Sequence, residues 1–154
     1  GKQSFFRSYD YIYDIDFEGE TYISRAIKKA HFLNPKAGIS IIISDLFSKD
    51  DYREGIDYLL YRGQDVVVIH ILSPQEREPN LDGSVQLIDS EDGSKLSIMA
   101  NNSLLRSYSE NVDKFLNGNR EFCHSRGIHY VDVNSNMDLE EIVFGLLMRQ
   151  KVIR

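Results

Sequence analysis

The stretch Ile39-Ser40-Ile41-Ile42-Ile43-Ser44 decides the fold class of this chain. A near-continuous run of β-branched residues is typical of a strand that is covered on both faces. A second run, from Val66 to Leu72, and a third, from Ile128 to Val133, have the same character, with helical patterns between them. Strands that alternate with helices pair through right-handed crossovers. The sequence therefore predicts an α/β fold in three layers, with a mostly parallel sheet flanked by helices.

Helical patterns fill the spaces between these strands. Apolar residues recur at helical spacing after Thr21 and again after Ser48, and each hydroxyl is expected to cap the helix that follows it. A long amphipathic pattern precedes the third strand, and a last one begins after Ser135 or Asn136, either of which suits an N-cap. The aromatic segment 4–16 has helical spacing, but its composition also suits a strand, so both structures remain open.

A β-hairpin is predicted within residues 83–99. Val85–Ile88 and Lys95–Ile98 are short strand-like runs that flank an acidic, glycine-containing loop. The loop residues 89–92 are interpreted as a solvated turn, because the loop lacks the glycine and closing glutamate of a calcium-binding loop. Since no repeat or long linker interrupts the chain, residues 1–154 are expected to form one domain with the hairpin as an insertion.

Composition limits the classes of function. The 154 residues carry a net charge of −6, and an acidic domain is a poor ligand for the phosphates of nucleic acids. No run approaches the roughly 18 apolar residues of a spanning helix, so no membrane insertion of this segment is expected. Cys123 is the only cysteine, which excludes an intrachain disulfide and a multi-cysteine metal site and favours a reducing, cytoplasmic setting.

Few residues suggest catalytic chemistry. The sequence has no glycine-rich nucleotide loop after a strand, no Gly-x-Ser-x-Gly elbow, and no His-x-x-x-His or Cys-x-x-Cys pair. His70 lies inside a predicted strand and His129 begins another, so both are expected to be structural. We therefore expect that the chain is not an enzyme.

Asp45 has the most suggestive position. It directly follows a buried strand, and open α/β sheets bind ligands at the carboxyl ends of their strands. A carboxylate at this place can bind a hard cation such as Mg²⁺, or it can merely cap the loop, and position alone leaves both open. Ser44, Ser48 and Ser73 lie at or just after strand ends and are the further candidate binding residues.

The strand 39–44 also raises a question about its neighbours. It is apolar enough for the middle of a sheet, yet it is the first clear strand in the chain. Natural proteins cover, charge or pair such edges. We therefore expect something to lie beside it: a further N-terminal strand, the segment from Tyr9 to Ile15, or a partner chain.

Seven short features occur in a specific order along the chain. They are Gly19–Ile27, Ile39–Asp45, Gly63–Val66, Ser73–Glu76, Leu81–Gly83, Leu104–Tyr108 and Arg149. Each is weak alone, but in this order and spacing they resemble the von Willebrand factor A-like domains. More narrowly, they resemble a bacterial family known only as domain of unknown function number fifty-eight, and the resemblance covers nearly the whole chain.

The resemblance implies a partial metal-ion-dependent adhesion site. Such sites hold a divalent cation with an Asp-x-Ser-x-Ser motif, a threonine and an aspartate, and Thr21 and Asp45 match the last two. The motif itself is absent, since the nearest string, Asp92–Leu96, lies in the hairpin. We expect the motif in an upstream segment, so that Mg²⁺ or Mn²⁺ binds in the full-length protein and no cation is bound by this chain alone.

The function that the resemblance implies is a non-catalytic protein-interaction or scaffolding module. The protein would be bacterial, cytoplasmic or part of a longer membrane-associated protein, and its partner an AAA-type ATPase of the MoxR kind. An acidic side chain of the partner would complete the metal shell. Because the missing strand would pair with residues 39–44, we expect a homodimer through that edge. The alternative is a small open α/β hydrolase or ligand-binding domain that uses Asp45, with Ser73 and Asn134 lining the crevice.

Overall fold

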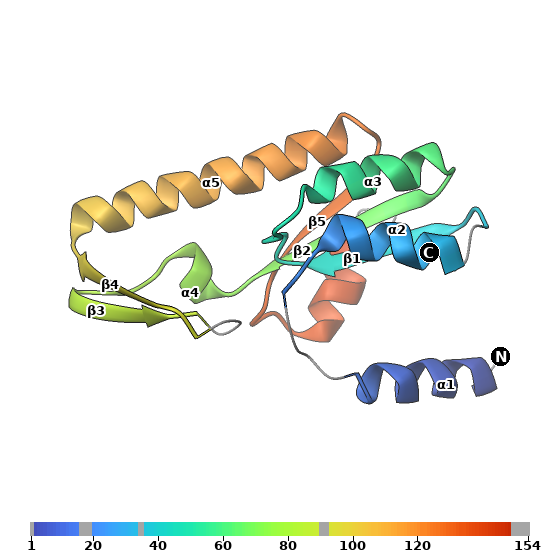
Figure 1. Cartoon of the computed structure of the whole chain (residues 1–154), viewed down its shortest axis with the longest axis horizontal. Helices are drawn as coiled ribbons and strands as arrows, with labels where there is room; N and C mark the ends of the chain where they lie inside the picture. The colour runs from blue at the N-terminus through green and yellow to red at the C-terminus, as the bar shows by residue number, and fades with distance from the viewer. Residues whose placement is uncertain (1, 16–19, 34–35, 90–92, 149–154) are drawn as a thin grey trace.

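A three-stranded parallel sheet forms the centre of the chain (Figure 1). The computed structural model describes residues 2–15, 20–33, 36–89 and 93–148. The strands are β1 (Ile39–Ser44), β2 (Asp65–Leu72) and β5 (His129–Asn134), in the order β1-β2-β5. The predicted α/β class and parallel sheet are confirmed, and each strand lies within one residue of its predicted limits.

Three helices cover one face of this sheet. They are α2 (Ile23–Leu33), α3 (Tyr52–Tyr61) and α5 (Asn102–His124). Their apolar side chains pack with one face of β2 into a large core cluster, in which Ile56 of α3 and Val68 of β2 are fully buried. The amphipathic spacing of these helices is the reason that they form this layer.

The π-helix η1 (Glu141–Leu147) covers the opposite face. Its residues Ile142 and Leu146 pack against a second cluster that contains Val67 of β2 and Val131 of β5. Helices on both faces of a sheet complete the three layers that the sequence predicts. Figure 1 shows η1, in orange-red, on the side of the sheet away from α2, α3 and α5.

β1 is covered on one face only. Ile42 packs into the core cluster, whereas Ile39, Ile41 and Ile43 are 68%, 56% and 64% exposed. β1 is also an edge strand, paired with β2 alone among the described residues. The prediction of a strand buried on both faces is therefore wrong, because η1 packs over β2 and β5, and within the part of the chain that the structure describes no residue covers this side of β1.

The segment after β2 forms a short helix and the predicted hairpin. The helix is α4 (Pro74–Arg77), and the antiparallel strands are β3 (Gly83–Ile88) and β4 (Lys95–Ala100). In Figure 1 the hairpin lies beyond the end of the sheet, beneath the first half of α5. The hairpin is confirmed, and its predicted solvated turn falls partly on residues 90–92, outside the described residues.

The N-terminal segment is the helix α1 (Lys2–Tyr13). None of its residues is buried, and Figure 1 shows it apart from the rest of the chain, on the same side of the sheet as η1. The strand alternative for this segment, and its pairing beside β1, are wrong. None of the described helices combines the length and apolar character that a membrane span requires.

The predicted caps of α3 and of the last helix are also wrong. Asp51, and not Ser48, caps α3, and its carboxylate accepts a hydrogen bond from the backbone N–H two residues ahead, at 3.0 Å. η1 follows Glu140 without a side-chain cap. Ser135 and Asn136 instead form a turn directly after β5.

Candidate binding crevice

A cavity of about 510 Å³ lies at the carboxyl end of β1. Its lining comes from four segments: the approach to α2, the loop after β1, α4, and the end of β3. The lining residues are Thr21, Asp45, Phe47, Ser48, Lys49, Glu76, Ile88 and Asp89. Of the residues predicted from sequence, Thr21, Asp45 and Ser48 are thus brought together, whereas Ser44 and Ser73 do not line the cavity.

A tight turn holds Asp45 at this opening. The Oδ1 atom of Asp45 accepts a hydrogen bond from the N–H of Phe47 at 3.0 Å and lies 3.3 Å from the Ser44 hydroxyl. The Ser44 Oγ atom in turn accepts from the N–H of Leu46 at 3.0 Å. Leu46 has a φ of 62°, the left-handed region that is uncommon for residues other than glycine, and its side chain is buried. The turn is therefore fixed by its surroundings.

His70 of β2 holds this turn from inside the protein. Its ring is fully buried, with Nε2 at 2.8 Å from the Asp45 carbonyl oxygen and Nδ1 at 2.6 Å from the Tyr130 hydroxyl. A carbonyl can only accept, so Nε2–H donates to Asp45 and the Tyr130 O–H donates to Nδ1. Burial lowers the pKa of His70, which favours this neutral form. These contacts are those expected of a structural histidine.

The second wall of the crevice is the N-terminus of α2, which is capped by a distant loop. The Ser48 Oγ atom accepts a hydrogen bond from the N–H of Ile23 at 3.1 Å. The Asp50 carboxylate accepts from the N–H groups of Ser24 and Arg25 at 3.2 and 2.9 Å. Thr21, predicted as the cap, instead offers its carbonyl oxygen to the N–H of residue 49 at 3.1 Å. These bonds tie the two segments that carry Thr21 and Ser48.

Asp50 was not predicted as part of this region. Desolvation raises the pKa of its carboxyl group, but the hydrogen bonds from Ser48 and from the N–H groups of Arg25 and Ser24 together lower it below its ordinary value. The carboxylate therefore remains charged beside the helix N-terminus, where a negative charge is favourable. In the sequence Asp50 stands next to Asp51, the cap of α3, so its position favours α3 and not α2 as the helix that it serves.

Ser73 has a structural position. Its Oγ atom accepts from the N–H of Glu76 at 3.2 Å, and the Glu76 carboxylate accepts from the N–H of Ser73 at 2.6 Å. This reciprocal pair is a capping box at the start of α4. One oxygen of Glu76 is thus committed to the helix, although the residue lines the cavity.

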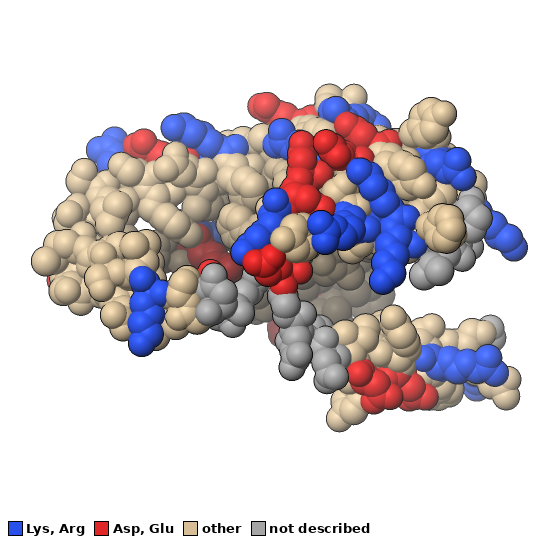
Figure 2. Space-filling model, viewed as in Figure 1, with Lys and Arg blue, Asp and Glu red and all other residues tan. Residues whose placement is uncertain are grey.

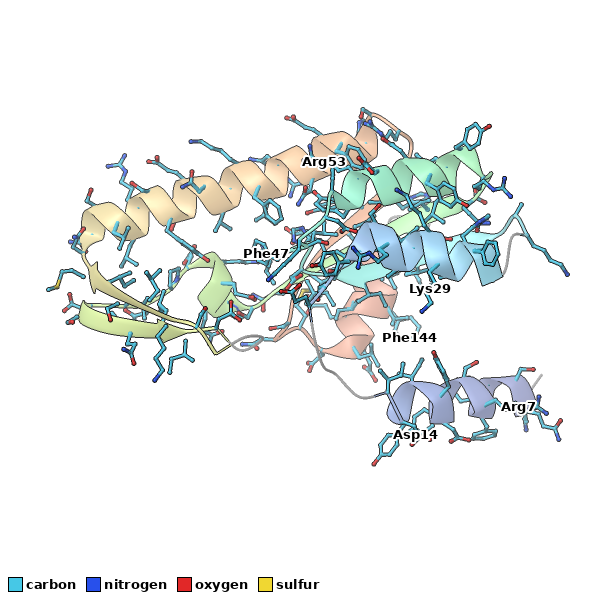
Figure 3. The ribbon with its side chains drawn as sticks, in the orientation of Figure 1. Arg7, Asp14, Lys29, Phe47, Arg53 and Phe144 are labelled. Atoms are coloured by element: carbon cyan, nitrogen blue, oxygen red, sulfur yellow. The ribbon has the colours of Figure 1, made fainter. Side chains whose placement is uncertain are left out.

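Two further contacts fix α4 and the mouth of the crevice. Arg77 of α4 forms an ion pair with Asp132 of β5, and Arg120 of α5 lies 3.7 Å from the same carboxylate. Phe47, labelled in Figure 3, stacks on Phe115 of α5 with ring centroids 5.1 Å apart. The charged pair joins residues 55 positions apart, so no local sequence pattern reveals it.

The side chains of the crevice do not fit a resident divalent cation. The described residues hold no cluster of three or more His, Cys, Asp and Glu side chains that could bind a metal ion. Hard cations take six or more oxygen ligands, and several must come from the protein to hold the ion tightly. Asp45 and Glu76 each use a carboxylate oxygen for a backbone N–H. The expected pair of ligands, Thr21 and Asp45, is therefore insufficient by itself.

Taken together, the parallel sheet, its helical layers and the crevice at the strand ends are those of an open α/β domain. The family model that matches the chain is "Protein of unknown function DUF58", over residues 1–114. Because the match covers more than half of the 154 residues, the chain belongs to this family. Comparison with curated proteins gave no match, and comparison with solved structures gave none.

Proposed function

We propose that this chain is a non-catalytic protein-interaction module of von Willebrand factor A-like type, and that it binds a polar side chain of its partner at the crevice. The observation that carries the proposal is the meeting of Thr21, Asp45 and Ser48 at one cavity, although they come from two separate segments. The Asp45 turn is held from behind by His70. Such rigidity suits recognition, because little ordering entropy is lost on binding.

The hydrogen bonds of the potential catalytic groups support a binding role over hydrolysis. Both ring nitrogens of His70 have partners, so this histidine is poorly placed to accept a proton from a substrate. Ser73 is committed to the capping box of α4. The side chain of Asn134 accepts from a backbone N–H at 2.9 Å in the turn after β5. Ser73 and Asn134, which line the crevice in the hydrolase alternative, thus form structural hydrogen bonds, and His70 offers no free ring nitrogen as a base beside Asp45.

The cation and partner of this module follow from the resemblance alone. Mg²⁺ or Mn²⁺ is proposed only for a protein that also carries the Asp-x-Ser-x-Ser segment, because two oxygen ligands are insufficient here. The proposed partner is an AAA-type ATPase of the MoxR kind, in the cytoplasm. Figure 2 is compatible with a protein partner, since basic and acidic side chains alternate over α2 and α3 and form no continuous basic surface on that face.

The crevice is tested by substitution of Asp45. Asp45→Asn keeps the oxygen that accepts from Phe47 and removes only the charge. We expect calorimetry with a purified MoxR-type ATPase to give binding to the wild type, at least tenfold weaker binding to Asp45→Asn, and unchanged binding to the control Glu121→Gln on α5. Equal binding by all three proteins would refute the proposal that the crevice binds the partner. Turnover of p-nitrophenyl acetate or phosphate that disappears in Asp45→Asn would refute the non-catalytic role.

We also propose that two copies of the chain pair through the edge of β1. The strand Ile39–Ser44 has no charged residue, and charge is a common protection of free edges. A two-fold pairing of identical strands would join the two sheets into one. We expect sedimentation to show a monomer–dimer equilibrium that Ser40→Lys shifts toward the monomer. A monomer at every concentration would refute the dimer.

A further inference from the structure

An apolar surface lies open on the η1 side of β1. In the parallel register Ile41 lies beside Val67 and Ile43 beside Ile69, so these side chains share one face of the sheet. Val67 and Ile69 are buried under η1, whereas Ile41 and Ile43 are more than half exposed. Phe144 of η1 is also exposed, over 64% of its own surface. Contiguous exposed apolar surface of this kind marks an interaction site.

α1 carries the matching surface. Phe5, Tyr9 and Ile12 recur at intervals of four and three residues and therefore share one side of the helix, with Phe6 and Tyr13 beside them. All five side chains are at least 58% exposed. A helix of 12 residues is marginally stable by itself in water. Its amphipathic pattern therefore indicates that α1 requires a surface to pack on.

The acidic residues of this segment lie on the side of α1 that is turned away from the rest of the chain. Figure 2 shows the acidic side chains on the outer side of α1, and Figure 3 shows Asp14 on that side and Arg7 at the far end of the helix. The side of α1 that faces η1 is largely free of charge in the same view. Phe144 projects from η1 on the side of α1 (Figure 3). In this view the uncharged side of α1 is thus turned toward Phe144 of η1.

We propose that α1 packs on the open face of β1, beside Phe144 of η1, within the same chain. The dimensions agree, because 12 helical residues span about 18 Å and the six residues of β1 about 20 Å. The nine residues 14–22 between α1 and α2 can span up to about 30 Å, enough to reach across the strand. A tether of this length gives an effective concentration near the millimolar range, which favours α1 of the same chain over α1 of a second copy.

This packing removes two exposed apolar surfaces from water at once. It leaves the backbone edge of β1 and the crevice at Asp45 untouched, so it does not depend on the proposed function. α1 is thus a strap that covers the strand next to the crevice, and its displacement exposes the isoleucines to a partner.

Cross-linking tests the orientation of α1. One variant carries Ile12→Cys and Ile41→Cys, and the control carries Tyr11→Cys, from the opposite side of α1, with Ile41→Cys. Burial raises the pKa of the native Cys123 thiol to about 11, so this residue competes poorly for a short bismaleimide. We expect rapid cross-linking within one chain for the first pair, at a rate independent of protein concentration, and slow cross-linking for the control.

Two results would overturn the proposal. Equal rates for both pairs would mean that α1 has no preferred side, and cross-linked dimers whose yield rises with concentration would mean that a second copy is the occupant. Amide hydrogen exchange gives an independent measurement without cysteine. Tyr9→Glu should accelerate exchange in α1 while β2 stays protected, whereas Tyr11→Glu should leave α1 unchanged. Equal effects of both substitutions on α1 would also contradict the strap.

Discussion

Gly55 offers a sharp test of how α2 and α3 pack to hold the crevice wall. A Cβ atom at Gly55 would lie 2.8 Å from the Cα atom of Ser24 and 3.0 Å from a side-chain carbon of Ile27. Backbone atoms cannot move aside unless α2 moves, and its N-terminus is fixed by Ser48 and Asp50. Overpacking costs roughly 1–3 kcal/mol, and alanine in place of glycine recovers about 1 kcal/mol of helix propensity. Because the obstacle is backbone, we expect Gly55→Ala to lose about 2 kcal/mol of stability.

Thermal unfolding measures this loss directly. For a chain of this size 1 kcal/mol corresponds to about 2–4 °C, so Tm should fall by about 4–8 °C. Gly118→Ala in α5 is the matched control, because its Cβ atom would meet only a terminal nitrogen of Arg53 at an ordinary 3.7 Å. This variant should be as stable as the wild type or gain up to about 1 kcal/mol from propensity. If Gly55→Ala melts at or above the wild-type temperature, the close contact of α2 and α3 is refuted.

Three further substitutions test the interior contacts. The pKa of His70 is lowered in the folded protein, so on acidification the unfolded chain binds a proton first. The free energy of unfolding should therefore fall as the pH drops through about 6.5. In urea titrations His70→Gln should make this fall smaller. Asp50 has a lowered pKa, so its stabilisation is present at neutral pH and lost in acid; Asp50→Asn should speed amide exchange in the first turn of α2, and unchanged exchange would disprove the cap. Asp132→Asn should cost about 1–2 kcal/mol, because Arg77 loses a charged partner in a partly buried site, whereas Glu110→Gln at an exposed pair should cost about 0.5 kcal/mol or less.

The strands and helices could be predicted because each depends on a local pattern. The β-branched runs identify β1, β2 and β5, and the apolar spacing identifies the helices around them. The burial of β1 could not be predicted in the same way. An apolar run such as Ile39–Ser44 shows that both faces of the strand can be buried. Whether both faces are buried depends on the elements that pack beside the strand. Here η1 packs over β2 and β5, and Ile39, Ile41 and Ile43 of β1 remain exposed.

The predictions of the helix caps were wrong for a related reason. A serine or an aspartate before a helical pattern is a good local cap, and both Ser48 and Asp51 precede α3. Only Asp51 serves α3, while Ser48 and Asp50 turn back to α2, about 25 residues earlier in the chain. The local sequence does not show whether such a side chain caps the next helix or a distant one, because this depends on where the loop passes in the folded chain.

Part of the crevice could be predicted from a general rule. Parallel strands present their carboxyl ends at one edge of the sheet, and this rule selected Asp45 and the residues around it. The support of the crevice could not be found in this way. His70 and Tyr130 are 60 residues apart, and Arg77 and Asp132 are 55 apart, so each pair depends on the finished sheet. The only local sign of these contacts is His70 itself, because a histidine within an apolar strand needs a hydrogen-bond partner when it is buried.

β1 connects the two surfaces of this chain. Its carboxyl end leads into the Asp45 turn, and the same strand carries the isoleucines that α1 is proposed to cover. On its inner face Ile42 packs in the core, and the Asp45 carbonyl is held by His70, so the strand is already fixed on one side. Packing of α1 would fix the other side as well. A partner that displaced α1 would therefore loosen the strand that presents Asp45, and occupancy of the two surfaces would be thermodynamically linked.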